Sequence, residues 1–360
     1  MPDIDQRDPA EVAAILTRWL ATRSGGGAAA EVFDVQAPAS NGFSNETILC
    51  RTRTTIDGVI DKRRLVVRVA PTKHLLFLNA EFSTQYRVMH SLSQGSGVPL
   101  PVLGWYEEDP SYLGVPFFTM EHVEGQVPAD NLPYTMEGWV LEATPEQQRR
   151  MWWSGIDALA SVHRTNWRAL GLEWLDHSGR GRPGLGQQMS YYRAFLDWAA
   201  HGVRVPVLES TWEWLVDHRP TEEGEVVLAW GDSRIGNIIW DDFRCAAVLD
   251  WEMATLGQPE MDLGWWLYFD RQFSEGLGVP RPAGFGSHEE TIARYSELMG
   301  RPMRHIFFYE VFSGFRFAVI MLRLSELLMG SDILPEDSDM GTNNLATQFL
   351  ATLLALPPPA

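Results

Sequence analysis

The spacing of apolar residues over the first 124 positions predicts one leading helix followed by an antiparallel sheet. Residues 9–22 carry apolar side chains at helical spacing after Asp8 and Pro9, two residue types that favour a helix N-terminus. Strand-like runs follow at 31–36, 46–54, 64–70, 99–106 and 115–123, and helical spacing recurs over 79–92. This order predicts a β-β-β-α-β-β sheet that carries one helix.

After residue 124 the apolar spacing is mostly helical. Helices are predicted over 145–163, where Thr144 is the expected N-cap, and then over 191–200, 208–218 and most of 261–356. Short apolar strands interrupt this pattern at 226–230, 237–240 and 246–250. The chain is therefore expected to have an α+β fold, with a small antiparallel-sheet lobe at 1–124 and a larger, mainly helical lobe at 125–360.

Composition narrows the class of partner and compartment. Twenty-nine basic and 47 acidic residues give a net charge of −18, which disfavours nucleic acid and anionic membranes as partners. The most apolar stretch, 307–328, is interrupted by four charged residues, so no membrane helix is expected. The N-terminus lacks a basic flank before an apolar run, and the two cysteines are far apart in sequence. These features predict a reduced, cytoplasmic protein.

The segment 228–262 carries the candidate chemistry. Asp232 and Asp250 each end an apolar strand, Arg234 lies two residues after Asp232, and Asn237 lies five residues after it. Turns also favour Asp and Asn, but four functional residue types at these offsets favour a catalytic interpretation.

Phosphoryl transfer explains why these residue types occur together. Asp232 can accept the proton of a substrate hydroxyl, and Arg234 can offset charge on the transferring group. The amide oxygen of Asn237 and the carboxylate of Asp250 are hard oxygen ligands suited to Mg²⁺ beside nucleotide phosphates. We therefore expect catalytic roles for Asp232 and Arg234, and metal-binding roles for Asn237 and Asp250.

These motifs resemble the aminoglycoside phosphotransferase and choline kinase family of small-molecule kinases. The resemblance is greatest to the branch related to kinase-like domains fused to acyl-CoA dehydrogenases. The matching segments are 42–47, 66–68, 85–88, 114–125, 159–163, 231–237 (GDSRIGN), 249–256 (LDWEMATL) and 262–263. The resemblance implies a two-lobed protein-kinase-like fold, with lobe 1–124 binding the nucleotide and lobe 125–360 holding the catalytic residues and the acceptor. It also implies ATP and Mg²⁺ as cofactors.

The resemblance also assigns nucleotide contacts. A loop containing Gly42, Ser44 and Asn45 would cover the phosphates, and the alternative interpretation of that loop is an ordinary hairpin turn. Arg68 stands where protein kinases have a phosphate-binding lysine, and the alternative is an exposed arginine on a strand. Backbone groups of a hinge segment would contact adenine; its residues are Glu121, His122 and Val123.

The sequence departs from the family pattern at two supporting positions. Gln85 replaces the glutamate that would pair with the strand cation, and Trp230 replaces a histidine before Gly231, which is expected to remove a polar support of the catalytic loop. His163 is expected to be a satisfied helix-end histidine, and Asp262 a cap or a brace of loop backbone. Weaker candidates for acceptor contact are Trp251, Glu252, Glu260 and Tyr268.

Together these features predict an ATP- and Mg²⁺-dependent phosphotransferase that moves the γ-phosphoryl group to a hydroxyl of a small molecule. The acceptor could be aminoglycoside-like, a sugar or a hydroxyacyl compound. The alternatives are a catalytically quiet nucleotide-binding regulatory protein of the same fold and a metabolite-binding protein without nucleotide. Motifs for zinc hydrolases, α/β-hydrolases and Walker-type nucleotide binding are absent from the sequence.

Overall fold

A computed structural model describes residues 7–24, 29–37, 45–71, 75–79, 81–176, 179 and 181–359. The chain divides into two compact units. Unit 1 comprises Met1–Leu76 and Pro101–Val123, and unit 2 comprises Phe77–Leu100 and Glu124–Ala360.

Unit 1 contains the predicted antiparallel sheet. Its strands are β1 (Ala29–Gln36), β2 (Glu46–Ile56), β3 (Val59–Val69), β4 (Leu103–Glu107) and β5 (Phe117–Glu121), and they lie in the order β1-β2-β3-β5-β4. Every neighbouring pair is antiparallel, so the predicted sheet is confirmed. Strands β2 and β3 are longer than predicted because their pairing continues to a tight turn at Asp57 and Gly58.

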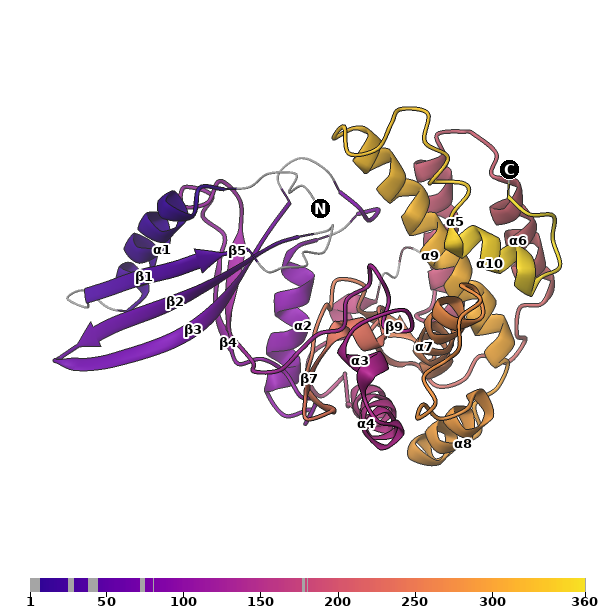
Figure 1. Cartoon of the computed structure of the whole chain (residues 1–360), viewed down its shortest axis with the longest axis horizontal. Helices are drawn as coiled ribbons and strands as arrows, with labels where there is room; N and C mark the ends of the chain where they lie inside the picture. The colour runs from indigo at the N-terminus through magenta and orange to yellow at the C-terminus, as the bar shows by residue number, and fades with distance from the viewer. Residues whose placement is uncertain are drawn as a thin grey trace. The chain divides into compact units, whose positions relative to one another are not determined.

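Helix α1 (Pro9–Arg23) packs on this sheet and begins as predicted, with the Asp8 carboxylate accepting from the backbone N–H of Ala10 at 2.9 Å. Figure 1 shows α1 running beside β1. The indole of Trp19 is buried and donates to Glu107 at 2.8 Å, which joins the helix to the end of β4. The shared core consists of Val12, Leu16, Trp19, Leu20, Val32, Ile48, Cys50, Val67, Val69, Leu113 and Phe117.

Helix α2 (Ser83–Ser93) lies in a segment whose grouping differs from the predicted lobe division. Residues 77–100 were expected within the lobe 1–124, but they group with unit 2. Hydrogen bonds to other parts of unit 2 explain this grouping: Gln85 Nε2 to Glu252 Oε2 (3.4 Å), Tyr191 OH to Leu78 O (2.9 Å) and Val248 N to Pro99 O (2.9 Å). The helix that packs within unit 1 is α1, rather than the one predicted over 79–92.

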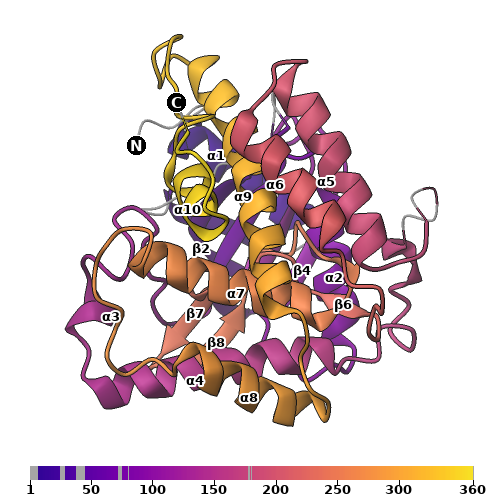
Figure 2. The same cartoon turned by 90° about the vertical axis from the view of Figure 1, so that its right-hand side faces the viewer.

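Unit 2 is mainly helical, as the apolar spacing predicted. Its helices are α3 (Trp139–Glu142), α4 (Pro145–His163), α5 (Leu185–Ala200), α6 (Pro206–Asp217), α7 (Pro259–Ser274), α8 (His288–Met299), α9 (Ile306–Met329) and α10 (Leu345–Leu353). Helix α4 starts at the predicted cap, where Thr144 and Gln147 form a capping box. Figure 2 shows α4 beside α8 and α7 against α9.

Two small antiparallel ribbons lie among these helices. Strand β7 (Ile238–Asp241) pairs with β8 (Arg244–Val248), and β6 (Val227–Ala229) pairs with β9 (Thr255–Gly257). Strand β9 was not predicted, because Thr255–Gly257 includes a glycine and lacks the apolar run that marks the equally short β6.

No helix in the described ranges is long and apolar enough to cross a membrane. Both cysteines are free, and burial raises the pKa of the Cys50 and Cys245 thiols to about 12.

Candidate active site

The β7–β8 ribbon brings two of the predicted residues to the same end of one hairpin. Ile238 pairs with Val248, so Asn237 comes directly before the first strand and Asp250 lies two residues after the second. The backbone N–H of Leu249 donates to Asn237 O at 2.8 Å, which extends the pairing up to Asp250. Asp250 has a φ of +58°, a left-handed conformation that is rare for residues other than glycine.

Asp232 lies against this end of the ribbon. The Asn237 amide nitrogen donates to the Asp232 carbonyl at 3.0 Å and to its Oδ2 at 2.6 Å. Arg234 Nε donates to Oδ1 at 3.1 Å, and Trp265 Nε1 donates to the same oxygen at 2.8 Å. The structure therefore brings Asp232, Arg234 and Asn237 into direct contact, with 16% of the Asp232 side chain exposed.

The loop before Asp232 is held by the buried carboxylate of Asp262, in the first turn of α7. The backbone N–H groups of Trp230 and Gly231 donate to Asp262 at 2.6 and 3.0 Å. His163 Nε2 lies 2.9 Å from the same carboxylate, and its Nδ1 contacts the Tyr295 hydroxyl. The predicted roles of Asp262 as a loop brace and of His163 as a satisfied helix-end histidine are confirmed.

Trp230 corrects one expectation. Its replacement of a histidine was expected to remove a polar support, yet its indole Nε1 donates to the Leu249 carbonyl at 2.7 Å and to the Asp250 carbonyl at 3.1 Å. The side chain is fully buried, so the support comes from inside the unit. The indole N–H thus joins the strand before Asp232 to the segment that contains Asp250.

Arg234 has a second carboxylate partner that the sequence motif did not reveal. Its Nη1 lies 2.5 Å from Asp130 Oδ1, and its guanidinium lies 5.8 Å from the Phe269 ring. Burial alone would lower the pKa of Arg234, but the charges of Asp130 and Asp232 outweigh it and hold that pKa above its ordinary value. Arg234 therefore remains a fixed positive charge beside Asp232.

The donor set at Asn237 and Asp250 suits Mg²⁺. Both N–H donors of the Asn237 amide point at Asp232, which leaves the amide oxygen as the group available to an ion. One amide oxygen and one carboxylate match a cation that keeps several water and phosphate ligands. In the described part of the chain, no three His, Cys, Asp or Glu side chains gather as a cage built from protein ligands alone would require.

The predicted nucleotide contacts are only partly described. Gly42 and Ser44 lie outside the described residues, whereas Asn45 is buried immediately before β2. Arg68, half-buried on β3, donates to the Thr47 hydroxyl at 2.7 Å across the β2–β3 pair. Gln85 donates to Glu252, so this departure from the family pattern has its own partner within unit 2.

The predicted hinge residues differ in their available backbone groups. The N–H of Glu121 donates to Val102 O at 2.8 Å, and that of His122 donates to Arg64 O at 2.9 Å. For Val123, no backbone hydrogen bond from its N–H to another described residue is present. Among these three residues, the N–H of Val123 is thus the one without a backbone acceptor in the described ranges, and its nucleotide role stays a prediction.

Three of the four weaker acceptor candidates are structural. Trp251 and Tyr268 are fully buried in the core of unit 2, so they offer no surface to a ligand. Glu260 is 4% exposed, and both of its carboxylate oxygens bind Arg301, at 2.6 and 2.9 Å. These three predictions are corrected, because each side chain is taken up by contacts within unit 2: Trp251 with Trp230, Tyr268 with Phe349 and Glu260 with Arg301. Glu252 is half-buried, and its acceptor role stays a prediction.

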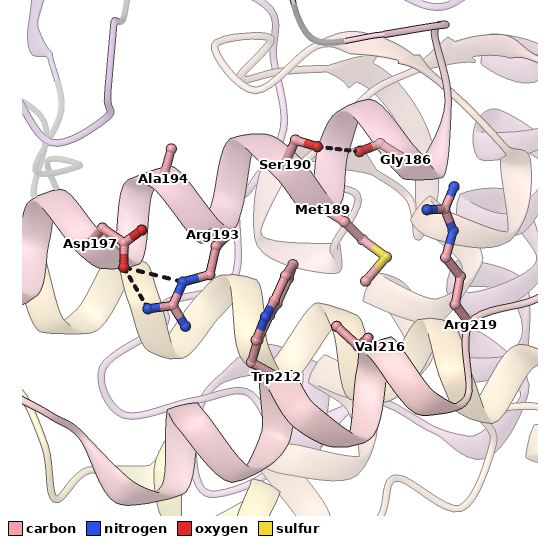
Figure 3. Close-up of a pocket in the computed structure, with 9 residues that line it drawn as sticks. All are labelled: Gly186, Met189, Ser190, Arg193, Ala194, Asp197, Trp212, Val216 and Arg219. Atoms are coloured by element: carbon pink, nitrogen blue, oxygen red, sulfur yellow. Dashed lines mark hydrogen bonds and ion pairs between the residues drawn. The ribbon is translucent and has the colours of Figure 1, made fainter.

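A cavity of about 450 Å³ lies elsewhere in unit 2, between α5 and α6. Figure 3 shows its apolar centre, Met189, Trp212 and Val216, with Arg193 and Arg219 toward its two ends. The carboxylates of Asp197, Glu209 and Glu223 bind these two arginines. None of the predicted site residues lines this cavity.

Sequence reasoning missed Asp130 and the role of Trp265. Asp130 precedes Arg234 by 104 residues, and no local pattern connects the two. Trp265 had a usable signal, because it lies three residues after Asp262 on α7, and residues at that spacing share a helix face. Since Asp262 faces the loop at 230–231, Trp265 should face the same loop.

Comparison with known sequences gives one family. Residues 35–298, more than half of the chain, match the profile of the phosphotransferase enzyme family. The human protein acyl-CoA dehydrogenase family member 11 is 30% identical over 249 residues, which cover 65% of this chain and 30% of that protein. The matched region thus corresponds to less than a third of that curated relative.

Two solved structures share the fold. One, from Ralstonia eutropha and assigned to the aminoglycoside phosphotransferases, has a TM-score of 0.66 at 22% identity and covers 96% of this chain and 98% of its own. The other is a thermostable mutant of an aminoglycoside phosphotransferase in a ternary complex with AMP-PNP and hygromycin B. It has a TM-score of 0.56 at 13% identity, with coverages of 94% and 98%. The predicted kinase-like α+β fold and the family resemblance are confirmed.

Proposed function

The chain belongs to the phosphotransferase enzyme family, and on that premise we propose that it transfers the γ-phosphoryl group of ATP to a hydroxyl of a small molecule. The observation that carries this proposal is the direct contact of Asp232 with Arg234 and Asn237 at the end of the ribbon that leads to Asp250. A carboxylate base, a cation and a pair of hard oxygen ligands are the groups that phosphoryl transfer requires.

Asp232 accepts the proton of the acceptor hydroxyl as that oxygen bonds to the γ-phosphorus, while the bond from phosphorus to the bridging oxygen breaks and ADP leaves. Its carboxylate is oriented by Trp265 and Asn237, so the base is positioned before the substrate arrives. Arg234 contacts both Asp232 and Asp130, and the incoming hydroxyl can displace it from Asp232 while Asp130 still holds it. Arg234 then lies beside the transferring group and offsets its charge.

Asn237 and Asp250 would hold Mg²⁺, which when bound neutralises charge on the nucleotide phosphates. Arg68 would bind a phosphate oxygen, and the N–H of Val123 would donate to the base. The ternary complex of the related fold contains a nucleotide analogue and an aminoglycoside. The presence of these two molecules supports the choice of a nucleotide donor and a hydroxyl-bearing acceptor here. The two free cysteines are compatible with a reducing compartment.

The test is transfer of radioactive phosphate from γ-labelled ATP with Mg²⁺ to a panel of aminoglycosides, sugars and hydroxyacyl compounds, together with slow hydrolysis when no acceptor is added. Asp232→Asn and Asp250→Ala should each abolish turnover while leaving the melting temperature close to that of the wild type. Asp242→Asn is the matched control, because Asp242 lies in the turn of the same ribbon, at the end opposite to Asn237 and Asp250, and its side chain is 72% exposed.

Unchanged turnover in either variant would contradict the proposal. Stabilisation of the wild type by ATP and Mg²⁺ without hydrolysis or transfer would instead indicate a nucleotide-binding regulatory protein. No stabilisation by nucleotide at all would indicate a metabolite-binding protein.

A further inference from the structure

Arg316, on α9, is a buried arginine without a carboxylate partner in the described residues. Its side chain is 1% exposed, and its Nη2 donates to the Gly231 carbonyl at 2.9 Å. Neither Nε nor Nη1 has a hydrogen-bond partner among the described residues, and no ion pair involves this arginine there. Buried arginines are normally paired, so this exception requires a physical explanation.

Contacts with aromatic rings offset part of the free-energy cost of burying the Arg316 charge. The Arg316 guanidinium carbon lies 4.4 Å from the centre of the Trp265 ring, 5.0 Å from that of Tyr192 and 5.9 Å from that of Phe312. Contacts of a desolvated cation with ring faces are favourable, but they do not replace a full salt bridge. The fold therefore retains a buried charge that costs stability. The groups that Arg316 contacts indicate why this charge is kept.

Both contacts of Arg316 lead to Asp232. The Trp265 ring that Arg316 faces donates its indole N–H to Asp232 Oδ1 at 2.8 Å. The carbonyl that Arg316 binds belongs to Gly231, the residue immediately before Asp232. The Arg316 guanidinium thus contacts two groups beside Asp232. One is the Trp265 ring, whose N–H orients the Asp232 carboxylate, and the other is the carbonyl of the peptide bond that links Gly231 to Asp232.

Gly231 needs such an anchor. Its φ is +94°, and an added Cβ would lie 2.1 Å from the Met253 carbonyl oxygen, so the backbone is confined in a left-handed conformation. Asp262 accepts from its N–H, and Arg316 donates to its C=O. Gly231 is therefore held at both of its backbone polar groups, with α7 supplying the acceptor for its N–H and α9 the donor to its C=O.

We propose that Arg316 is a positioning residue for the reaction: it holds Trp265 and the Gly231 carbonyl so that the Asp232 carboxylate keeps its catalytic orientation. This inference rests on the proposed function. Arg316 contributes no group to the reacting atoms, since its side chain is enclosed in the core of unit 2.

The kinetic test uses hydrolysis of Mg²⁺-ATP. Arg316→Met fills a similar volume without the charge and should lower kcat at least about tenfold, the effect of losing about 1.4 kcal/mol of transition-state stabilisation. The KM for ATP should stay within about twofold, because no nucleotide contact is removed. Arg316→Lys keeps a charge that can donate to Gly231 O and should restore part of kcat.

The matched control is Arg323→Met on the same helix. The Arg323 guanidinium carbon also lies 4.4 Å from a tryptophan ring, that of Trp198, but its ion pair is with Glu326. This variant should leave both kcat and KM within about twofold of the wild type. The melting temperature of Arg316→Met should change little, because loss of the hydrogen bond to the Gly231 carbonyl and removal of a poorly paired buried charge act in opposite directions.

A second readout is independent of activity. In protein labelled with ¹⁵N-tryptophan, the Trp265 indole resonance, identified by its loss in Trp265→Phe, reports the hydrogen bond to Asp232. It should shift in Arg316→Met and stay in place in Arg323→Met. If the wild type neither binds nor hydrolyses ATP, the proposed function fails, and the indole resonance still decides what Arg316 does.

An unshifted Trp265 resonance in folded Arg316→Met would overturn the inference. So would a parallel fall of melting temperature and kcat that Arg316→Lys does not relieve, because that pattern belongs to a residue that only stabilises the fold.

Discussion

Arg234 bridges two carboxylates, with its Nη1 2.5 Å from Asp130 and its Nε 3.1 Å from Asp232. The two acids are not equivalent, since 53% of the Asp130 side chain is exposed and only 16% of that of Asp232. The more exposed acid can retain the arginine when a substrate hydroxyl takes its place at the buried one. On the proposed mechanism, this difference gives Asp130 a role beside the motif although it precedes Arg234 by 104 residues.

Asp130→Asn should therefore lower kcat for Mg²⁺-ATP turnover about tenfold, equivalent to about 1.4 kcal/mol. Without the Asp130 charge, Arg234 stays on Asp232 and competes for the carboxylate that must accept the proton. The melting temperature should change by less than about 2 °C, because the lost pair is half-exposed. Asp157→Asn is the control, since the Asp157 side chain is also 53% exposed and pairs with an arginine, Arg294, at 3.4 Å. Equal activity of the two variants would refute this role.

Gly236→Ala tests the same pair by steric means. An added Cβ would lie 2.5 Å from Arg234 Nη1 and 2.8 Å from Asp130 Oδ1, so the two side-chain ends must move apart. We expect a loss of kcat similar to that of Asp130→Asn with little loss of stability, because flexible ends can yield. The double variant should be little worse than either single variant, since both break one interaction. Fully additive losses in this cycle would argue against a shared cause.

Gly231→Ala should behave differently. Its Cβ would meet a backbone carbonyl, that of Met253, at 2.1 Å, and the φ of +94° is unfavourable for alanine. A backbone atom cannot yield as a side-chain end does, so we expect a loss of at least about 3 kcal/mol in the free energy of unfolding. Urea unfolding of the two glycine variants side by side measures the contrast, and equal midpoints would contradict it.

Trp230→Phe removes an indole N–H that two carbonyl groups share. The buried carbonyls of Leu249 and Asp250 lose this donor, which should cost about 1–3 kcal/mol of stability and lower kcat. Trp152→Phe provides the comparison, because Trp152 is equally buried and also loses one hydrogen bond, to Thr291. That variant should lose stability without a specific loss of kcat. If both variants retain wild-type kcat, Trp230 is not a support of the site.

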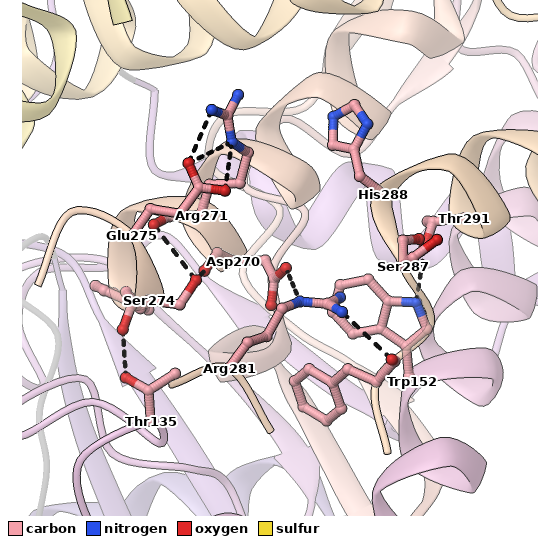
Figure 4. Close-up of polar contacts among 12 residues, drawn as sticks. Thr135, Trp152, Asp270, Arg271, Ser274, Glu275, Arg281, Ser287, His288 and Thr291 are labelled. Carbon is pink, nitrogen blue, oxygen red and sulfur yellow. Dashed lines mark hydrogen bonds and ion pairs between the residues drawn. The ribbon is translucent and has the colours of Figure 1, made fainter. Parts of the chain in front are cut away.

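His288 makes stability depend on pH. Its hydrogen bond to Glu310, at 3.1 Å, raises the pKa of His288 above 6.5 despite burial and the nearby Arg271. Figure 4 shows His288 and Arg271 among the neighbouring polar contacts. The folded protein holds this proton more tightly than the unfolded chain, so the contribution is complete below pH 6.5 and is lost as pH rises through the raised pKa.

The matching measurement is the melting temperature of wild type and His288→Gln from pH 5.5 to 8.5. Below pH 6.5 the wild type should melt about 1–2 °C higher, since a third of the side chain is exposed and the ion pair contributes at most about 1 kcal/mol. The difference should shrink as pH rises. A difference that grows with pH would show that the sign is wrong.

The sequence predicted the sheet and the helix starts because local rules determine them. Thr144 caps α4 and Asp8 caps α1 where capping preferences place them, and the alternation of buried and exposed residues in β2 is typical of a strand. The ends of β2 and β3 were less predictable, because the first six residues of β3 are all exposed and show no alternation.

Within the site, residues joined by a motif were predictable and residues joined by packing were not. The short segment 232–237 contains Asp232, Arg234 and Asn237, so their spacing in the sequence is enough to bring them together. In the sequence, Arg316 is only one of the four charges that interrupt the apolar run 307–328, because nothing in a helix pattern indicates which charge is buried. The acceptor contacts expected at Trp251 and Tyr268 failed for the complementary reason, since an aromatic residue near a motif is more often core than surface.

The β7–β8 ribbon also bears on how the protein can be engineered. Its turn, where Asp242 and Phe243 both have positive φ, is the end opposite to Asn237 and Asp250, and its Asp242 pairs with Arg150 at 2.9 Å at the surface. A short epitope or a reporter peptide spliced between these two turn residues would be separated from the chemistry by the full length of both strands. The ribbon therefore provides a handle for immobilising or labelling the protein at the end away from Asn237 and Asp250.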